Sequence, residues 1–149
     1  MAANTKPIFI STANKGIVTG VRLTTSNTTR DLSDTTGAQL LFSAGTNGSR
    51  VESIDFTHSS SGQTLSDRVS VVSVGRVFLC SDTIGSNPIL IKEVVLPAVT
   101  SSVSAIGSTS TISFTTPLFL SSGQCLWVSM SNNQNGGGYY DVTVYGGDY

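Results

Sequence analysis

The chain contains a single histidine, His58, and three serines follow it directly at positions 59–61. Histidine and serine can act as the base and nucleophile of a hydrolase, provided that a carboxylate orients the histidine and donors stabilise the oxyanion. We expect this run to form the polar tip of a loop, where nothing excludes water or builds an oxyanion site. The pattern therefore does not predict an enzyme, and we expect no catalytic residues.

Two groups of carboxylates could bind a metal ion or cleave a glycosidic bond. Asp31 and Asp34 lie in one polar stretch, but calcium takes roughly six to eight oxygen ligands, and loop aspartates commonly bond to their own backbone. Glycoside cleavage would draw on Glu52, Asp55 and Glu93, yet Glu52 and Asp55 face opposite sides of one predicted strand and cannot pair. We therefore predict no metal site and no cofactor.

The two cysteines, Cys80 and Cys125, each lie inside an apolar, strand-like run. Two cysteines alone cannot complete a zinc site, and neither has a second cysteine at Cys-x-x-Cys spacing. We interpret them as buried free thiols that pack as small hydrophobic side chains. A cross-strand disulfide is the alternative, and the absence of an export signal weighs against it.

Charge is sparse along the chain and is not clustered. Charged residues make up 11% of the 149 residues, against a usual value of about 25%. Serine and threonine take their place, at about 29%. The net charge is −1, and the arginines and lysines are scattered. Binding to nucleic acid requires clustered positive charge, so we expect no nucleic-acid partner.

No apolar run approaches the ~20 residues that a membrane-spanning helix needs, so we expect no membrane partner. The first residues, Met-Ala-Ala-Asn-Thr-Lys-Pro, lack the apolar core of a signal peptide. We therefore expect the protein to be made and kept in a cytoplasm, unless lysis or an unusual route releases it.

The elements that would position these residues are short strands. Apolar stretches alternate with turns rich in Gly, Ser, Thr and Asn, and no stretch combines helical periodicity with helix caps. We predict an all-β fold of about 8–9 short antiparallel strands. Hairpins alone would leave long exposed edges, so the expected architecture is a single β-sandwich domain spanning residues 1–149, jelly-roll-like in its topology.

Residues 39–58 are the clearest example of this design. They read as two strands joined by a tight turn at the Asn-Gly pair 47–48, which favours a hairpin. In the second strand, Glu52, Ile54, Phe56 and His58 share one face, and we expect Ile54 and Phe56 to lie in the core. Residues 25–36 are predicted to form a long loop anchored by Leu32.

The chain begins with a segment that we expect to dock on another surface. Residues 1–16 read as an N-terminal arm, because proline is poorly placed inside a central strand and the residues after it are apolar on both sides. The terminal Tyr149 is a further candidate for packing on a neighbouring subunit. The predicted interface residues are Pro7, Ile8, Phe9, Ile10 and Tyr149.

Aromatic residues late in the chain could instead line a sugar-binding face. Trp127 is better explained as a core or interface residue, since large aromatic side chains dominate both environments. The candidates for such a face are Trp127, Tyr139, Tyr140, Tyr145 and Tyr149.

Six stretches, in order along the whole chain, resemble the small virion proteins of tailed bacteriophages. They consist of turns and strand edges. The stretches are Asn-Thr-Lys-Pro-Ile-Phe at 4–9, Asn-Thr-Thr-Arg-Asp-Leu at 27–32, Phe-Ser-Ala-Gly-Thr-Asn-Gly-Ser-Arg-Val at 42–51, Glu-Val-Val-Leu-Pro at 93–97, residues 118–123, and Gly-Gly-Asp-Tyr at 146–149.

Within that class, the chain is most similar to the head decoration, or capsid cement, proteins. The resemblance implies a jelly-roll-like protein that forms homotrimers on the capsid exterior of the virion. It implies the major capsid protein as the partner, and clamping of the shell against internal DNA pressure as the function. It carries over no catalytic residue. The alternative is a tail-fibre or baseplate module that binds a host-surface glycan, and an enzyme acting on cell walls is a more distant possibility.

Overall fold

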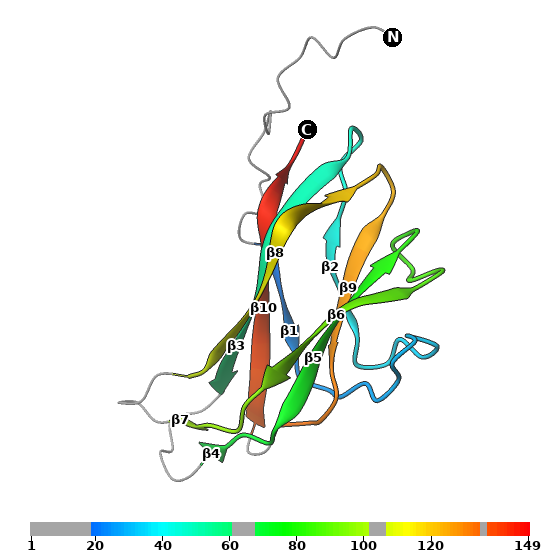
Figure 1. The fold of residues 1–149 in the computed structure, drawn as a ribbon. Coiled ribbons are helices and arrows are strands. Elements are labelled where there is room, and N and C mark those ends of the chain that lie inside the picture. Colours follow the sequence, from blue (N-terminus) through cyan, green and yellow to red (C-terminus); the bar gives the residue numbers. More distant parts are fainter. Residues whose placement is uncertain (1–18, 61–67, 102–106, 135–136) are drawn as a thin grey trace, which may run out of the picture.

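The computed structural model describes residues 19–60, 68–101, 107–134 and 137–149, and these form a sandwich of two four-stranded antiparallel sheets (Figure 1). The first sheet contains β1 (Thr19–Leu23), β3 (Ser49–Ser60), β8 (Thr109–Leu120) and β10 (Gly138–Asp148). The second contains β2 (Gln39–Ser43), β5 (Ser73–Cys80), β6 (Ile89–Leu96) and β9 (Cys125–Met130). A small separate pair is formed by β4 (Arg68–Val69) and β7 (Thr100–Ser101).

The strand order identifies the topology as a jelly roll. The sheets are ordered β1-β10-β3-β8 and β2-β9-β5-β6. Apart from the small β4–β7 pair, the chain crosses to the other sheet at every connection except the one between β5 and β6. The predicted all-β, jelly-roll-like sandwich is therefore confirmed for the described residues.

The predicted hairpin at residues 39–58 is wrong. β2 pairs with β9 in the second sheet, whereas β3 pairs with β10 and β8 in the first. A two-residue hairpin turn of the predicted kind needs positive φ at both central residues, but only Gly48, at φ 89°, has it. The hydrogen bond from the Gly48 N–H to the Gly45 carbonyl closes an ordinary turn, which carries the chain across the sandwich.

Ile54 and Phe56 are fully buried between the sheets, as predicted. The face assigned to Glu52 is wrong, because the pairing of β3 with β8 shifts register between Val51 and Ser53. This β-bulge reverses the alternation, so that Val51 is buried and Glu52 is exposed.

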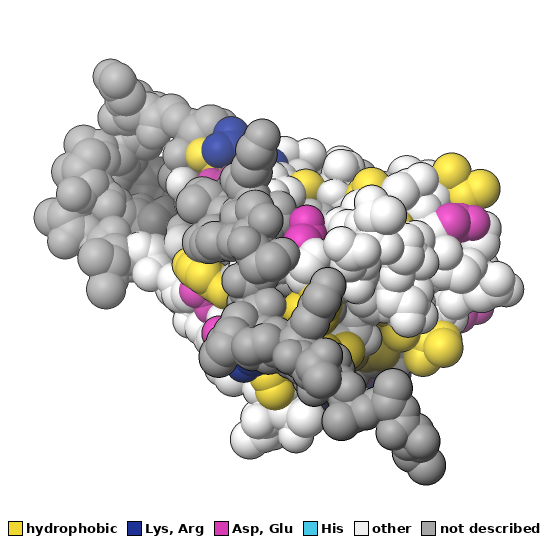
Figure 2. Space-filling model, turned by 90° about the horizontal axis from the view of Figure 1, so that it is seen from above, with side chains coloured by type: hydrophobic (Ala, Val, Ile, Leu, Met, Phe, Trp, Pro, Cys, Tyr) yellow, Lys and Arg dark blue, Asp and Glu magenta, His cyan; other side chains and the backbone are white. Residues whose placement is uncertain are grey.

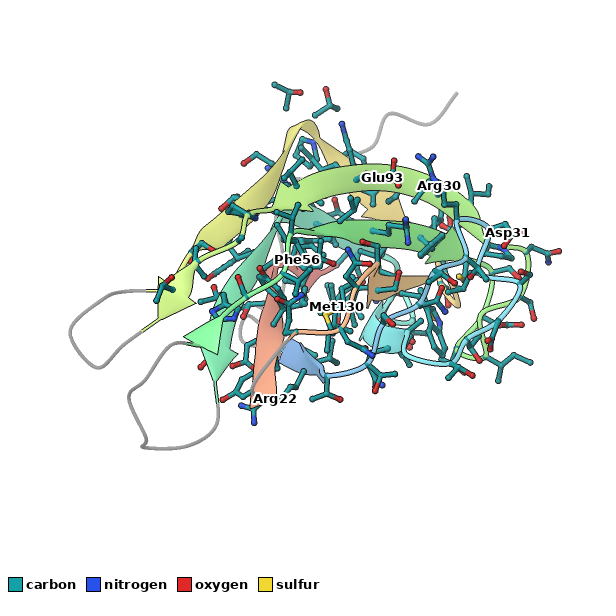
Figure 3. The ribbon with its side chains drawn as sticks, turned by 90° about the horizontal axis from the view of Figure 1, so that it is seen from below. Arg22, Arg30, Asp31, Phe56, Glu93 and Met130 are labelled. Atoms are coloured by element: carbon teal, nitrogen blue, oxygen red, sulfur yellow. The ribbon has the colours of Figure 1, made fainter. Side chains whose placement is uncertain are left out.

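Gly75 lies in β5 directly beside the Phe56 ring. A Cβ atom at this position would be 2.9 Å from a ring carbon of Phe56. Glycine thus allows the ring from the first sheet to approach the backbone of the second. Figure 3 shows Phe56 in the space between the two sheets, with Met130 near it.

The loop between β1 and β2, residues 24–38, folds back over the outer face of the second sheet. Leu32 is buried there with Ala38, Phe78 and Cys80, and Trp127 packs against them. Leu32 adopts φ 55°, a conformation that few non-glycine residues take. The predicted anchor is confirmed, and the loop gives the second sheet a small apolar cluster on its outer side.

Candidate functional site

His58 is a core residue. Its side chain is 3% exposed, its ring lies edge-on to that of Tyr140 at 5.3 Å between centroids, and neither ring nitrogen has a hydrogen-bond partner. Burial lowers the pKa of His58 below its usual value, which keeps the ring neutral. Ser59 donates to the Tyr139 hydroxyl rather than to the histidine. The arrangement holds no base–nucleophile pair at this position.

The carboxylates singled out in the sequence lie in separate places. Asp31 accepts bonds from the hydroxyl and N–H of Ser33, and these bonds lower its pKa. Asp34 accepts the N–H of Thr36, which lowers its pKa in the same way. Among the described residues, no three His, Cys, Asp or Glu side chains are grouped so that they could hold a metal ion.

Cys80 and Cys125 lie directly opposite each other on β5 and β9, and both are buried free thiols. The pKa of Cys80 is raised to about 11, mainly by burial and to a smaller extent by the nearby Cys125 and Asp82. The Cys125 sulfur lies 3.2 Å from the Ser43 hydroxyl oxygen. The interpretation as buried thiols is confirmed, and the disulfide is absent from this structure.

The candidate sugar-binding aromatic residues do not converge. Tyr140 is fully buried in the core, and Trp127 packs beneath the β1–β2 loop. Tyr139 and Tyr145 lie near opposite ends of β10, and the Arg22 guanidinium covers the Tyr139 ring at 3.8 Å. Only Tyr149 has an aromatic neighbour at the surface, which is Phe119. Of this set, only Tyr145 and Tyr149 lie towards the same end of the sandwich, so the five residues form no single platform among the described residues.

A network of charged and polar groups holds the β1–β2 loop on the second sheet. Arg76, on β5, donates from Nη1 to the Asn27 carbonyl at 3.0 Å and from Nε to Glu93 Oε1 at 3.1 Å. Arg30, on the loop, pairs with the other oxygen of Glu93. Partial desolvation raises the pKa of Glu93, but the bonds from both arginines outweigh it and lower the pKa overall. Figure 3 shows Arg30 beside Glu93.

Asn27 organises the interior of the same loop. Its side chain is buried and donates from Nδ2 to the carbonyls of Asp34, at 2.6 Å, and Thr36, at 2.8 Å. Its Oδ1 accepts the N–H of Thr29 at 3.0 Å, and its own N–H bonds to the Met130 carbonyl at 2.8 Å. The loop is thus built around one buried amide, and we call this region, with Arg30, Arg76 and Glu93, the loop clamp.

The second built surface is at the end of the sandwich where the chain terminates. Ser49 bonds to the Asp148 carboxylate and accepts the Gly45 N–H at 2.9 Å. The Tyr149 N–H donates to the Gly48 carbonyl at 3.1 Å, and Asn47 Nδ2 donates to the Tyr149 carbonyl at 3.2 Å. The C-terminal residues and the β2–β3 turn are therefore tied together, and we call them the chain-end cluster.

Beside the chain-end cluster lie two exposed aromatic rings and the half-buried ring of Tyr149. Phe119 is 57% exposed and stacks on Tyr149, with ring centroids 6.3 Å apart. Tyr145, on β10, is 40% exposed. We call Phe119, Tyr145 and Tyr149 the aromatic patch. Figure 2 looks onto this end of the molecule, where hydrophobic side chains reach a surface made mostly of uncharged groups.

The described stretches that gave the resemblance contribute residues to these two places. Residues 27–32 and Glu93 belong to the loop clamp. Residues 42–51, 118–123 and 146–149 meet at the chain-end cluster and the aromatic patch. Sequence reasoning missed Asn27, Arg76 and Phe119 as site residues, although two of them lie within those stretches.

Of the predicted interface residues, only Tyr149 belongs to the described part of the chain. Its ring stacks on Phe119 of its own sandwich and its backbone is bonded to the β2–β3 turn. Its role at an interface stays a prediction. The arm, residues 1–16 with Pro7, Ile8, Phe9 and Ile10, lies outside the described residues.

The described residues include no helix that is long and apolar enough to span a bilayer. Comparison of the chain with family models, curated proteins and solved structures finds no significant match.

Proposed function

We propose that this chain is a structural virion protein of a tailed bacteriophage, which binds the outside of the capsid and stabilises the shell as a decoration protein. In this proposal the major capsid protein is the partner, and a homotrimer made in the host cytoplasm is the binding unit. The protein performs no catalysis.

The observation that carries the proposal is the convergence of the resembling stretches. All of them except the first, which lies outside the described residues, belong to the loop clamp or border the chain-end cluster. Stretches that are far apart in the sequence and resemble one class of protein thus each contribute residues to one of two built surfaces, while others of their residues, such as Val51 and Leu96, lie in the core. Binding residues lie disproportionately on loops that a rigid scaffold positions, so similarity carried by such loops supports a shared binding role.

The construction of both surfaces suits a cement function. A protein that holds neighbouring shell subunits against pressure needs surfaces that keep their shape under load. Buried Asn27 and Arg76 fix the loop clamp, while Ser49 and Asp148 fix the end of the chain. Prior ordering of these groups reduces the entropy lost on binding, which favours tight attachment.

Copy number tests the proposal against the glycan-binding alternative. Particles of the phage that encodes the chain are purified, and the chain is quantified by mass spectrometry against the major capsid protein. Decoration predicts a simple integer ratio to the shell protein. A handful of copies per particle would point to a tail or baseplate module, and absence of the chain would overturn the virion assignment.

Shell stability provides the functional readout. Particles that lack the chain should release DNA at a lower temperature than complete particles, and added purified chain should restore the difference. Light scattering should give the free protein a mass three times that of the 15.5 kDa chain. Unchanged DNA release without the chain would contradict the stabilising role.

A further inference from the structure

The aromatic patch has two exposed rings, one half-buried ring and two polar atoms without hydrogen-bond partners. The Phe119 ring is stacked on Tyr149 and still largely exposed. Arg50 lies opposite Phe119 on the neighbouring strand. The Nε atom of Arg50 and the hydroxyl of Tyr149 are shielded from solvent yet have no hydrogen-bond partner. Shielded polar atoms of this kind are normally paired, so the patch has the features of an incomplete contact.

We propose that the apolar segment Pro7, Ile8, Phe9 and Ile10 of the same chain binds the aromatic patch. The segment supplies apolar side chains for the exposed rings. Its backbone carbonyls would offer acceptors to Arg50 Nε and the Tyr149 hydroxyl once these shielded side chains turn towards the segment. This contact does not depend on the virion assignment.

The register of the first sheet places the start of β1 at the same end of the sheet as the aromatic patch. Thr19, the first residue of β1, pairs with Val144 near the end of β10, and the two strands are antiparallel. Gly147, three residues further along β10, is level with Arg50, which in turn pairs with Phe119. The chain before Thr19 is therefore attached at the end of the sheet that carries the aromatic patch.

The connecting chain is long enough to reach the patch of its own sandwich. Three strand spacings separate β1 from β8, which amounts to ~14 Å across the sheet, and three residues along the strand add ~10 Å at right angles. The nine residues from Ile10 to Thr19 span up to ~30 Å when extended. A tether of this length gives a high effective concentration, which favours the patch of the same chain over that of another copy.

Charge favours the same contact. Residues 1–18 contain two of the 8 basic residues, Lys6 and Lys15, and no acidic residue. The remaining chain therefore holds six basic and all 9 acidic residues. Glu52 is already paired with Arg50 at 3.0 Å, so Asp148 is the acidic side chain next to the patch that remains for the arm. A basic segment is attracted electrostatically to an acidic side chain beside its binding site.

The contact would join the predicted interface residues into one surface. Pro7 to Ile10 would lie against Tyr149, so that an interface containing the arm would also contain the end of the chain. The exposed rings would then be covered, and clustered exposed apolar side chains commonly mark such contact sites.

Photo-crosslinking from the arm tests the proposal in the full chain. Phe9→p-benzoylphenylalanine is irradiated in solution, and the linked peptides are identified by mass spectrometry. We expect links to peptides that contain Phe119 or Tyr145, in a product that migrates as a single chain. Links in a product of twice the mass would assign the patch to a neighbouring copy and overturn binding within one chain. Links to other surfaces, or no links, would overturn the site.

Limited proteolysis tests the binding of the arm to the patch independently. With the arm bound, cleavage after Lys15 by trypsin should be slow, and Phe119→Ser should accelerate it by about fivefold or more. Ile84→Ser is the matched control, because Ile84 is 76% exposed and lies in the β5–β6 connection of the second sheet. Equal cleavage rates in the Phe119→Ser and Ile84→Ser variants would contradict the proposal. Tyr145→Ser serves as a second patch variant.

Discussion

Arg76 donates from Nη1 to the carbonyl oxygen of Asn27 at 3.0 Å, across a separation of 49 residues in the chain. The contact joins the central strand β5 to the loop that covers it. Because Asn27 in turn bonds the backbone at Asp34 and Thr36, one guanidinium supports the whole loop clamp.

Replacing Arg76 should therefore loosen the loop and destabilise the protein. The Arg76 side chain is only 8% exposed, so Arg76→Ala leaves the Asn27 carbonyl unpaired and should cost about 2–4 kcal/mol of unfolding free energy. Arg30 binds the same Glu93 but is 67% exposed, so Arg30→Ala should cost at most about 1 kcal/mol. Urea denaturation of both variants measures the difference. Equal losses of unfolding free energy in the two variants would show that the burial of Arg76 makes no additional contribution to stability.

Gly75→Ala should destabilise the core through the Phe56 ring. The added methyl would lie 2.9 Å from a ring carbon, and overpacking of this kind costs about 1–3 kcal/mol. Phe56→Leu, which removes the ring, should cost less in the Gly75→Ala background than in the wild type. A double-mutant cycle measured by denaturation gives this coupling. If the losses of unfolding free energy in the two single variants simply add in the double variant, the methyl group of Gly75→Ala contacts a group other than the Phe56 ring.

His58 should make the protein less stable in mild acid. Its pKa in the folded state is lowered by burial, so below the unfolded value of about 6.5 the unfolded chain binds more protons. Stability contributed by the neutral ring is therefore present above that pH and is lost as the pH falls towards the folded pKa, by at most about 1.4 kcal/mol per pH unit.

The test compares unfolding free energies of the wild type and His58→Phe between pH 7 and pH 5. The carboxylates with lowered pKa values, such as Asp31 and Asp34, affect stability only at more acidic pH. The wild type should lose stability over this window and the variant should not. Parallel curves would show that another group titrates there.

The thiol of Cys80 should react only when the protein opens. With its pKa raised to about 11, only about one molecule in a thousand carries the thiolate at pH 8, and the side chain is buried. Labelling with an aromatic disulfide reagent should proceed at a rate set by unfolding and should accelerate with urea. Rapid labelling of the native protein would contradict this expectation.

Local pattern was enough to predict the core of β3 and the anchor of the long loop. Ile54 and Phe56 alternate with polar residues, and Leu32 is isolated among polar neighbours, so burial follows from side-chain type alone. The count of short strands similarly led to the sandwich, because eight strands without helices have few other ways to bury their apolar faces.

Other features depend on contacts between distant parts of the chain. The turn at Asn47 and Gly48 has the composition of a hairpin, but the partner of each strand is set by the rest of the sandwich. The bulge beside Glu52 depends on β8, which is about sixty residues away. The roles of Arg76 and Asn27 were missed for the same reason, since neither residue has a partner close by in the sequence that reveals its burial.

The position of β10 affects how the protein can be synthesised. This strand lies between β1 and β3 in its sheet, and β9 lies between β2 and β5 in the other. The second sheet therefore cannot be completed before residue 130 is synthesised, nor the first before residue 148, and until then strands that pair with β9 and β10 keep unpaired backbone groups. Completion of both sheets has to follow translation of these residues. A chain that ends before residue 138 lacks the strand that pairs with β1 among the described residues, so it cannot complete the first sheet.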